Sequence, residues 1–223
     1  ERPFAFSPPV LHVVGAGSGF AAMHNERNYA RSMALAHSDP LTGCPNRRAL
    51  ESAVKREVAG GRRNGSTLAL IVLDMDGFKQ INDRHGHDVG DAVIVAMAAL
   101  LQRQVRGADM VARYGGAEFC ILLPDTDEAG AATQAERLRL AVQHHRFPHG
   151  EGLTASFGIA ASAADAGFDW RDCFCRADTA LYEAKRRGRN RVAVASPGGA
   201  APRAPGGPTP ARREPPRRPA RVG

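Results

Sequence analysis

The feature that most restricts the fold is an unbroken apolar run from Thr67 to Leu73, with residues that favour turns on both sides. The run has the length of a strand, and its β-branched residues Ile71 and Val72 favour that conformation. Because no polar residue alternates along it, neither face of such a strand is suited to solvent. The sequence therefore predicts a central strand in a sheet that other elements cover on both sides.

Other segments supply those elements. A pair of short apolar runs flanks Gly115-Gly116 and is typical of a tight β-hairpin, which interrupts the alternation of helices and strands. We therefore expect a mixed sheet with helices packed on it, in the α+β class, rather than an all-parallel one. The predicted helices span about 20–36, 46–58, 89–105, 128–144 and 172–187, and the further strands 110–114, 118–123, 153–160 and 191–195.

The 223 residues suffice for one globular domain with additional segments at both ends. We expect an N-terminal segment with a stalk helix over 1–37, the domain over 38–195 and a tail over 196–223. This tail holds six arginines against one glutamate, so it accounts for +5 of the net charge of +7, and it contains eight of the fifteen prolines. Such a composition predicts disorder. Because the body is nearly balanced in charge, no specific nucleic-acid partner is expected.

The beginning of the chain suggests a larger context. It starts at Glu1, and the apolar run from Val10 to Met23 is too short and too interrupted by glycine to span a membrane. We expect a cytoplasmic domain whose parent protein carries an upstream sensor or membrane region. A surface segment without special role is equally compatible with this run.

Three groups of residues are candidates for chemistry. Asp74 and Asp76 leave the end of the central strand, where hard cations such as Mg²⁺ find carboxylate ligands, although a solvated turn explains them as well. Gly115 and Gly116 would let a phosphate or ribose approach the backbone, but a hairpin turn also needs glycine. The basic cluster over 185–191 suits either a phosphate or the negative end of a helix dipole.

In order along the chain, these pieces resemble the GGDEF family of diguanylate cyclases from about Ser38 to Ala195. The matching segments are DPLTGCPNRRAL (39–50), LDMDGFKQINDRHGHDVGD (73–91), RGADMVARYGGAEF (106–119), SFGIA (156–160) and ADTALYEAKRRGRNRV (177–192). The resemblance implies a palm-like domain that condenses two GTP molecules into cyclic di-GMP. It also implies a homodimer in which each domain presents one GTP, and a dependence on Mg²⁺ or Mn²⁺.

The resemblance also assigns roles to individual positions. Asp74 and the backbone carbonyl of Met75 match metal ligands, and Arg106 and Asp109 match the RxxD pair of an inhibitory site for the product, although a surface ion pair would explain that spacing too. The remaining positions match groups that bind the substrate: Asn82 and Asp91 for guanine, Phe78 and Lys79 beside the first metal, Gly115 and Gly116 in the signature loop, and Lys185 and Arg189 for phosphates.

The departure from the family pattern is Ala117. It occupies the third position of the signature, where the family has an aspartate or glutamate that binds metal and activates the attacking hydroxyl. A methyl group does neither, so we expect reduced catalysis. Glu118 matches the fourth position, and its side chain is expected on the opposite face from that of Ala117.

Four hypotheses about function follow. The chain is an active or weakened cyclase, or a catalytically inactive module that binds GTP or cyclic di-GMP. Alternatively, Ala117 was introduced into an active enzyme to trap a substrate complex. RNA binding through the arginine-rich tail is a distant fourth, because such segments bind polyanions with little specificity.

Overall fold

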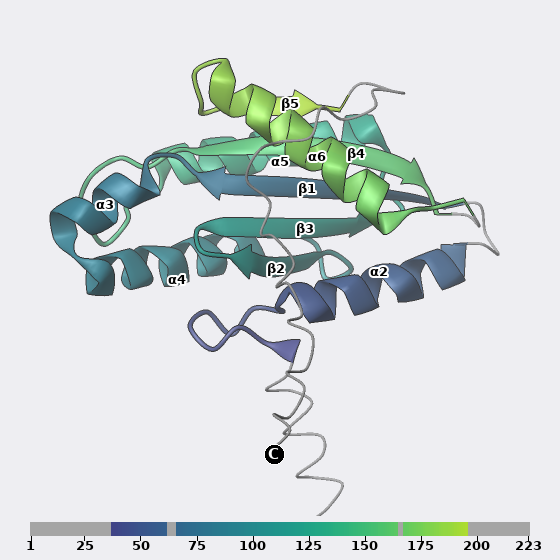
Figure 1. Cartoon of the computed structure of the whole chain (residues 1–223), viewed down its shortest axis with the longest axis horizontal. Coiled ribbons are helices and arrows are strands. Elements are labelled where there is room, and N and C mark those ends of the chain that lie inside the picture. The colour runs from purple at the N-terminus through teal and green to yellow at the C-terminus, as the bar shows by residue number, and fades with distance from the viewer. Residues whose placement is uncertain (1–36, 62–65, 165–166, 196–223) are drawn as a thin grey trace, which may run out of the picture.

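The computed structural model describes residues 37–61, 66–164 and 167–195, and its centre is a five-stranded sheet with the order β2-β3-β1-β4-β5 (Figure 1). Neighbouring strands run antiparallel except β4 and β5, which are parallel. The predicted mixed sheet is thus confirmed. The strands are β1 (Thr67–Met75), β2 (Met110–Gly115), β3 (Glu118–Pro124), β4 (Ala155–Ala163) and β5 (Val192–Val194).

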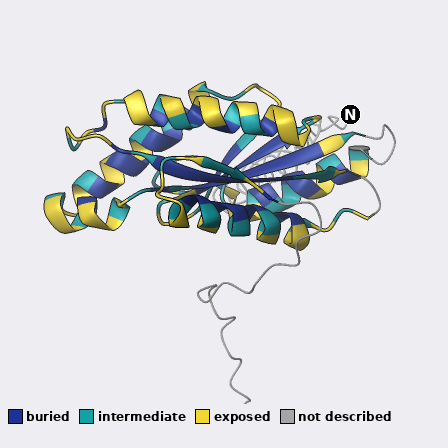
Figure 2. Ribbon diagram, turned by 90° about the horizontal axis from the view of Figure 1, so that it is seen from above, coloured by how far each residue is buried: buried dark blue, intermediate teal, exposed yellow. Residues whose placement is uncertain are grey.

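Helices cover both faces of this sheet, and the strands between them are buried (Figure 2). One face packs against α3 (Phe78–His85), α4 (His87–Arg103) and α5 (Glu128–His144). The other face packs against α2 (Arg47–Gly61) and α6 (Trp170–Arg186). The domain is therefore an α+β sandwich of helices around one mixed sheet, which confirms the predicted class.

Strand β1 occupies the middle of the sheet and belongs to both cores. Ile71 and Leu73 pack on the side of α4 and α5, whereas Leu70 and Val72 pack on the side of α2 and α6. Its neighbours β3 and β4 pair with it along nearly its whole length. The apolar run thus lies buried on both faces, as its composition predicts, and the first polar side chain on the α6 side is that of Asp74.

Helix α6 lies unusually close to the sheet because β4 contains Gly158. A Cβ atom built at Gly158 would lie 2.1 Å from the Ala177 carbonyl oxygen and 2.3 Å from the Leu181 backbone nitrogen. Real Cβ atoms do not make such contacts, so only glycine allows this approach. The last turn of α6 follows Leu181, and the close packing holds Lys185 within reach of the end of β1.

The structure differs from the expected elements at several points. Helix α6 begins at Trp170 rather than Asp172, because the Asp169 carboxylate accepts a hydrogen bond from the Arg171 backbone nitrogen and caps the helix. Strand β4 starts and ends later than expected, at Ala155 and Ala163. Helix α3 was not expected at all, since it is short and Ile81 is its one buried residue.

The predicted stalk helix and the predicted disordered tail lie outside the described residues. Within the described ranges, no helix has the length and apolar character needed to cross a membrane.

Candidate active site

The two aspartates that leave β1 have separate environments. Asp76 accepts hydrogen bonds from the hydroxyls of Thr154 (2.8 Å) and Ser156 (2.8 Å) and from the backbone nitrogen of Asn190 (3.0 Å). Its carboxylate therefore joins β4 and the loop after α6 to the end of β1. Asp74 instead accepts a hydrogen bond from Lys185 Nζ on α6. Of the two predicted candidates, Asp74 is the one available to a cation.

Glu118 stands opposite Asp74 in the register of β1 and β3. Residues directly opposite one another on antiparallel strands place their side chains on the same face. Ala117 packs instead against the core on the side of α4 and α5. The expectation that the third and fourth signature positions face opposite ways is confirmed. Glu118 is the site residue that sequence reasoning undervalued, because its strand register relative to Asp74 is a tertiary property.

The charges of this face are unbalanced. Burial raises the pKa of Asp74 in spite of the hydrogen bond from Lys185. Burial also raises the pKa of Glu118, and the negative charge of Asp74 raises it further. Burial likewise raises the pKa of Asp178 on α6, although the charge of Lys185 offsets part of the rise. Three carboxyl groups thus share one lysine, an arrangement that favours the arrival of a further cation.

The donor set fits a metal that is shared with a ligand. Among the described residues, no three or more histidine, cysteine or acidic side chains are grouped closely enough to form a metal centre of their own. Mg²⁺ in phosphate chemistry is commonly held by one or two carboxylates together with phosphate oxygens and water. Asp74 and Glu118 meet that requirement. Met75 follows Asp74 directly and is the last residue of β1.

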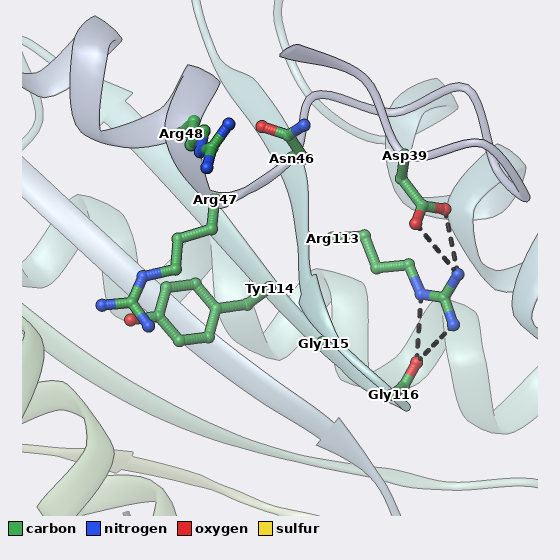
Figure 3. A pocket seen from close by; sticks show the side chains of 8 residues that line it. All are labelled: Asp39, Asn46, Arg47, Arg48, Arg113, Tyr114, Gly115 and Gly116. Carbon is green, nitrogen blue, oxygen red and sulfur yellow. Dashed lines mark hydrogen bonds and ion pairs between the residues drawn. The ribbon is translucent and has the colours of Figure 1, made fainter. Parts of the chain in front are cut away.

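The tip of the hairpin is held by Arg113. Its Nε and Nη2 donate to the Gly116 carbonyl oxygen (3.1 and 2.9 Å), and its Nη1 donates to Asp39 (2.9 Å), as Figure 3 shows. Asp39 also accepts from the backbone and hydroxyl of Thr42. Although burial opposes it, these hydrogen bonds lower the pKa of Asp39. The signature loop is therefore fixed to the segment that precedes α2.

A second group lies where α3 meets α4. A Cβ atom at Gly90 would lie 1.8 Å from Asn82 Oδ1, so a larger residue there would displace the Asn82 side chain. Asn82 Oδ1 is buried, and no group of the described residues donates a hydrogen bond to it. The next residue, Asp91, is exposed, and so is Lys79, whereas Phe78 is half-buried. Because Gly77 connects β1 to α3, this group begins close to Asp74.

The predicted basic cluster after α6 does not act as one unit. Arg186 and Arg187 form ion pairs with Glu183, whereas Lys185 turns to Asp74. Arg189 is exposed and has a positive φ of 62°. Among residues 37–61, 66–164 and 167–195, no side chain pairs with its guanidinium group. Within the described residues, Lys185 is thus the cation of the cluster that contacts Asp74, and Arg189 and Arg191 form no ion pair.

Arg106 and Asp109 lie at the other end of β2, roughly 20 Å from Gly115 at about 3.3 Å per strand residue. The Asp109 carboxylate accepts a hydrogen bond from the Arg106 backbone nitrogen (2.9 Å) and stabilises the turn before the strand. The surface ion pair between their side chains is not formed among the contacts that the structure describes. The guanidinium group of Arg106 is left exposed beside this turn.

The fold and the carboxylate pair at the end of the central strand define an α+β domain of the palm type. The sequence profile described as "Diguanylate cyclase, GGDEF domain" matches residues 36–191. The chain therefore belongs to the GGDEF domain family.

Curated relatives agree with this assignment. The chain is 43% identical over 175 residues to diguanylate cyclase DgcP of Pseudomonas aeruginosa, a match that covers 78% of this chain and 26% of that protein. It is 40% identical over 174 residues to the response regulator PleD of Caulobacter vibrioides, with coverage of 74% and 37%. The chain thus spans about a quarter to just over a third of these relatives.

Solved structures show the same fold. The coiled coil and GGDEF domain of DgcB from Caulobacter crescentus, determined in complex with c-di-GMP, has a TM-score of 0.74 at 33% identity and covers 81% of this chain and 96% of that one. The active GGEEF domain of a diguanylate cyclase from Vibrio cholerae has a TM-score of 0.64 at 35% identity, with coverage of 69% and 98%. These matches identify the described domain with the GGDEF fold.

Proposed function

We propose that this domain condenses two GTP molecules into cyclic di-GMP as a diguanylate cyclase of reduced activity. The observation that carries the proposal is the pairing of Asp74 and Glu118 on one face of the sheet, below Lys185. The two carboxylates would hold Mg²⁺ or Mn²⁺ together with phosphate oxygens, and the Met75 carbonyl would be an additional ligand. When bound, the metal polarises the reacting oxygens and offsets the phosphate charge.

The other residues bind and orient the nucleotide. Lys185 and Arg189 contact the phosphates, so that Lys185 exchanges its hydrogen bond with Asp74 for one with a phosphate oxygen. Asn82 and Asp91 recognise the edge of guanine, which offers donors to a carboxylate and both kinds of partner to an amide. The remaining positions, Phe78, Lys79, Gly115 and Gly116, line the path of the phosphates and the ribose.

Ala117 limits the reaction in this proposal. Its methyl group leaves the attacking ribose hydroxyl without the carboxylate expected at that position, and loss of a general base costs on the order of 10²–10⁴-fold in rate. Glu118 shares the face of Asp74 and keeps a second carboxylate beside the metal. Turnover is therefore slow rather than absent.

The second candidate is a catalytically inactive module that binds GTP or cyclic di-GMP. The exposed guanidinium group of Arg106, beside a turn stabilised by Asp109, favours binding of the product there. Such a module would bind nucleotide tightly and release no product.

The reaction requires two domains, because each presents one nucleotide, so we propose a homodimer. Residues 1–37 would form the stalk, 38–195 the cyclase domain and 196–223 the tail, on the cytoplasmic side of a larger protein. Light scattering with and without GTP tests the assembly.

The deciding experiment incubates the full chain with GTP and Mg²⁺ or Mn²⁺ and measures cyclic di-GMP by chromatography. Glu118→Gln is the test variant, and Glu57→Gln on α2 is the matched control. We expect slow product formation by the wild type and the control, and none by Glu118→Gln. Equal turnover by all three would refute the role of Glu118. Nucleotide binding without any product would select the second candidate.

A further inference from the structure

A pocket of about 470 Å³ lies between the start of α2 and the end of β2, outside the carboxylate pair (Figure 3). Asn46, Arg47 and Arg48 line one side of it, and Arg113 lines the other with Gly115 and Gly116. It shares only the hairpin glycines with the proposed active site. None of the residues given a role in the proposed reaction supplies its positive charge.

Arg113 and Asp39, which line the pocket opposite Arg47 and Arg48, form an ion pair with each other. All three guanidinium nitrogens of Arg113 are engaged, by Gly116 and by Asp39. Asp39 is the one acidic residue of the wall, and its carboxylate is occupied by Arg113 and Thr42. Arg47 is also paired, with Glu51, so among the described residues Arg48 is the cation of the pocket whose charge no acidic side chain offsets.

Arg47 and Arg48 have donors to spare. The Nε atom of Arg47 donates to Glu51 (3.0 Å), and its guanidinium group lies over the Tyr114 ring, 4.9 Å from the centroid. Within the part of the chain that the structure describes, its terminal nitrogens make no hydrogen bond, and the side chain of Arg48 has no hydrogen bond or ion pair. Both residues are exposed. At least two guanidinium edges can thus turn to an anion.

The position of Arg48 is electrostatically unfavourable without a ligand, whereas Glu51 offsets the charge of Arg47. Arg47 and Arg48 are the first two residues of α2, whose first turn contains no acidic residue. The N-terminus of a helix carries partial positive charge, so acidic residues are preferred there and cations are disfavoured. The Asn46 side chain accepts a hydrogen bond from the Ala49 backbone nitrogen at the start of the helix. A bound anion would face the cations and the other backbone amides of the first turn, which have no partner within the helix. An anion would relieve this repulsion.

The glycine side of the pocket leaves room for a bulky anion. Cβ atoms built at Gly115 and Gly116 would meet no atom within 4 Å, so the backbone is open on that side. Arginine forks match the tetrahedral oxygens of a phosphate through paired hydrogen bonds. We propose that this pocket binds a phosphate group, either of a free polyphosphate such as pyrophosphate or of a nucleotide.

Calorimetric titration of the full chain with pyrophosphate at low ionic strength tests the site, because salt screens such contacts. Arg48→Ala should weaken binding roughly tenfold or more, which is the effect of losing a charge-assisted hydrogen bond. Arg56→Ala removes an exposed arginine of the same helix outside the pocket and should change nothing. Circular dichroism checks that both variants are folded. Equal affinities of the two variants, or no binding by the wild type at roughly millimolar pyrophosphate, would overturn the proposal.

A Lys185→Ala background separates this site from the proposed active site. In this background, Arg48→Ala should still weaken the affinity for pyrophosphate. If Lys185→Ala instead abolishes binding and Arg48→Ala has no effect, pyrophosphate occupies the active site and the pocket proposal is wrong, while the proposed function stands.

Further titrations in that background identify the source of the phosphate. If Arg48→Ala weakens the affinity for a non-hydrolysable GTP analogue more than it weakens the affinity for pyrophosphate, the pocket binds a nucleotide phosphate. If Arg48→Ala weakens the affinity for pyrophosphate equally or more, the pocket binds the free anion. Guanosine, which lacks phosphate, should show no dependence on Arg48, and a dependence as large as that of the nucleotide would refute recognition of phosphate.

Discussion

Asp74 and Glu118 face each other across the boundary between β1 and β3, and Lys185 bonds to the first of them. The sheet thereby supplies two carboxylates to one face whatever residue occupies position 117. Their opposition depends on antiparallel pairing of strands that are more than 40 residues apart in the sequence. The site is a property of strand register as much as of the signature loop.

Replacement of Glu118 by glutamine should stabilise the protein without ligand at neutral pH. Because burial raises the pKa of Glu118, its ionised form is less favourable in the folded chain than in the unfolded one. The resulting loss of stability sets in as the pH rises through the ordinary value of 4.5 and is complete above the folded pKa. Because Glu118 is exposed, solvent screens much of this effect, and we expect Tm to rise by only about a degree.

Thermal unfolding at a series of pH values checks this prediction, with Glu57→Gln as the control. The gain should disappear at acid pH, where Glu118 is protonated in both states. A gain that persists unchanged below about pH 3 would show that the effect is not electrostatic.

Replacement of Lys185 by methionine should lower kcat/KM by about 10²–10³-fold if the proposed reaction occurs, since the lysine both faces the phosphates and offsets the carboxylate pair. Steady-state kinetics of cyclic di-GMP formation measures this. Arg187→Met is the matched control, because Arg187 lies at the same helix end but pairs with Glu183. Comparable losses in both variants would contradict a specific role for Lys185.

Replacement of Asp76 by alanine should destabilise the fold by about 2–4 kcal/mol, because it removes three hydrogen bonds and leaves the buried Ser156 hydroxyl without its acceptor. Urea unfolding measures the loss. Ser156→Ala removes one of these bonds and should cost about 1 kcal/mol. A stable Asp76→Ala protein with altered metal dependence would instead make Asp76 a metal ligand.

Replacement of Ala117 by glutamate should raise the rate of cyclic di-GMP formation by about 10²-fold or more, if the missing carboxylate limits turnover. The half-buried methyl group lies beside the core of the α4 side, so the new side chain must turn toward solvent. Product formation from GTP measures the change. Equal rates in the wild type and the variant would show that Ala117 does not limit the reaction.

The sheet and most helices could be predicted because their signals are local. The run over 67–73 has no polar alternation, and the hairpin is marked by two glycines between apolar arms. Helix α3 gave no such signal, because it buries one residue and follows Gly77 without a side-chain cap. It packs against α4, where the Asn82 side chain lies against Gly90.

The candidate site was only partly visible in the sequence. Asp74 could be located because it ends a buried strand. The distinction between Asp74 and Asp76 could not, because it depends on Thr154 and Ser156, which are about 80 residues away. The same is true of the basic cluster, since Glu183 forms ion pairs with two of its arginines, whereas Lys185 bonds to Asp74.

The central place of β1 has a consequence for amide exchange. Its amides are enclosed by a neighbouring strand on each edge and by helices on both faces, so they should be among the slowest of the chain to exchange with solvent. Gly115 and Gly116 lie at an exposed hairpin tip and should exchange by local opening. If the distance between the two carboxylates changes, we expect the hairpin rather than Asp74 to move, within the limit that the Arg113 bonds to Gly116 and Asp39 set.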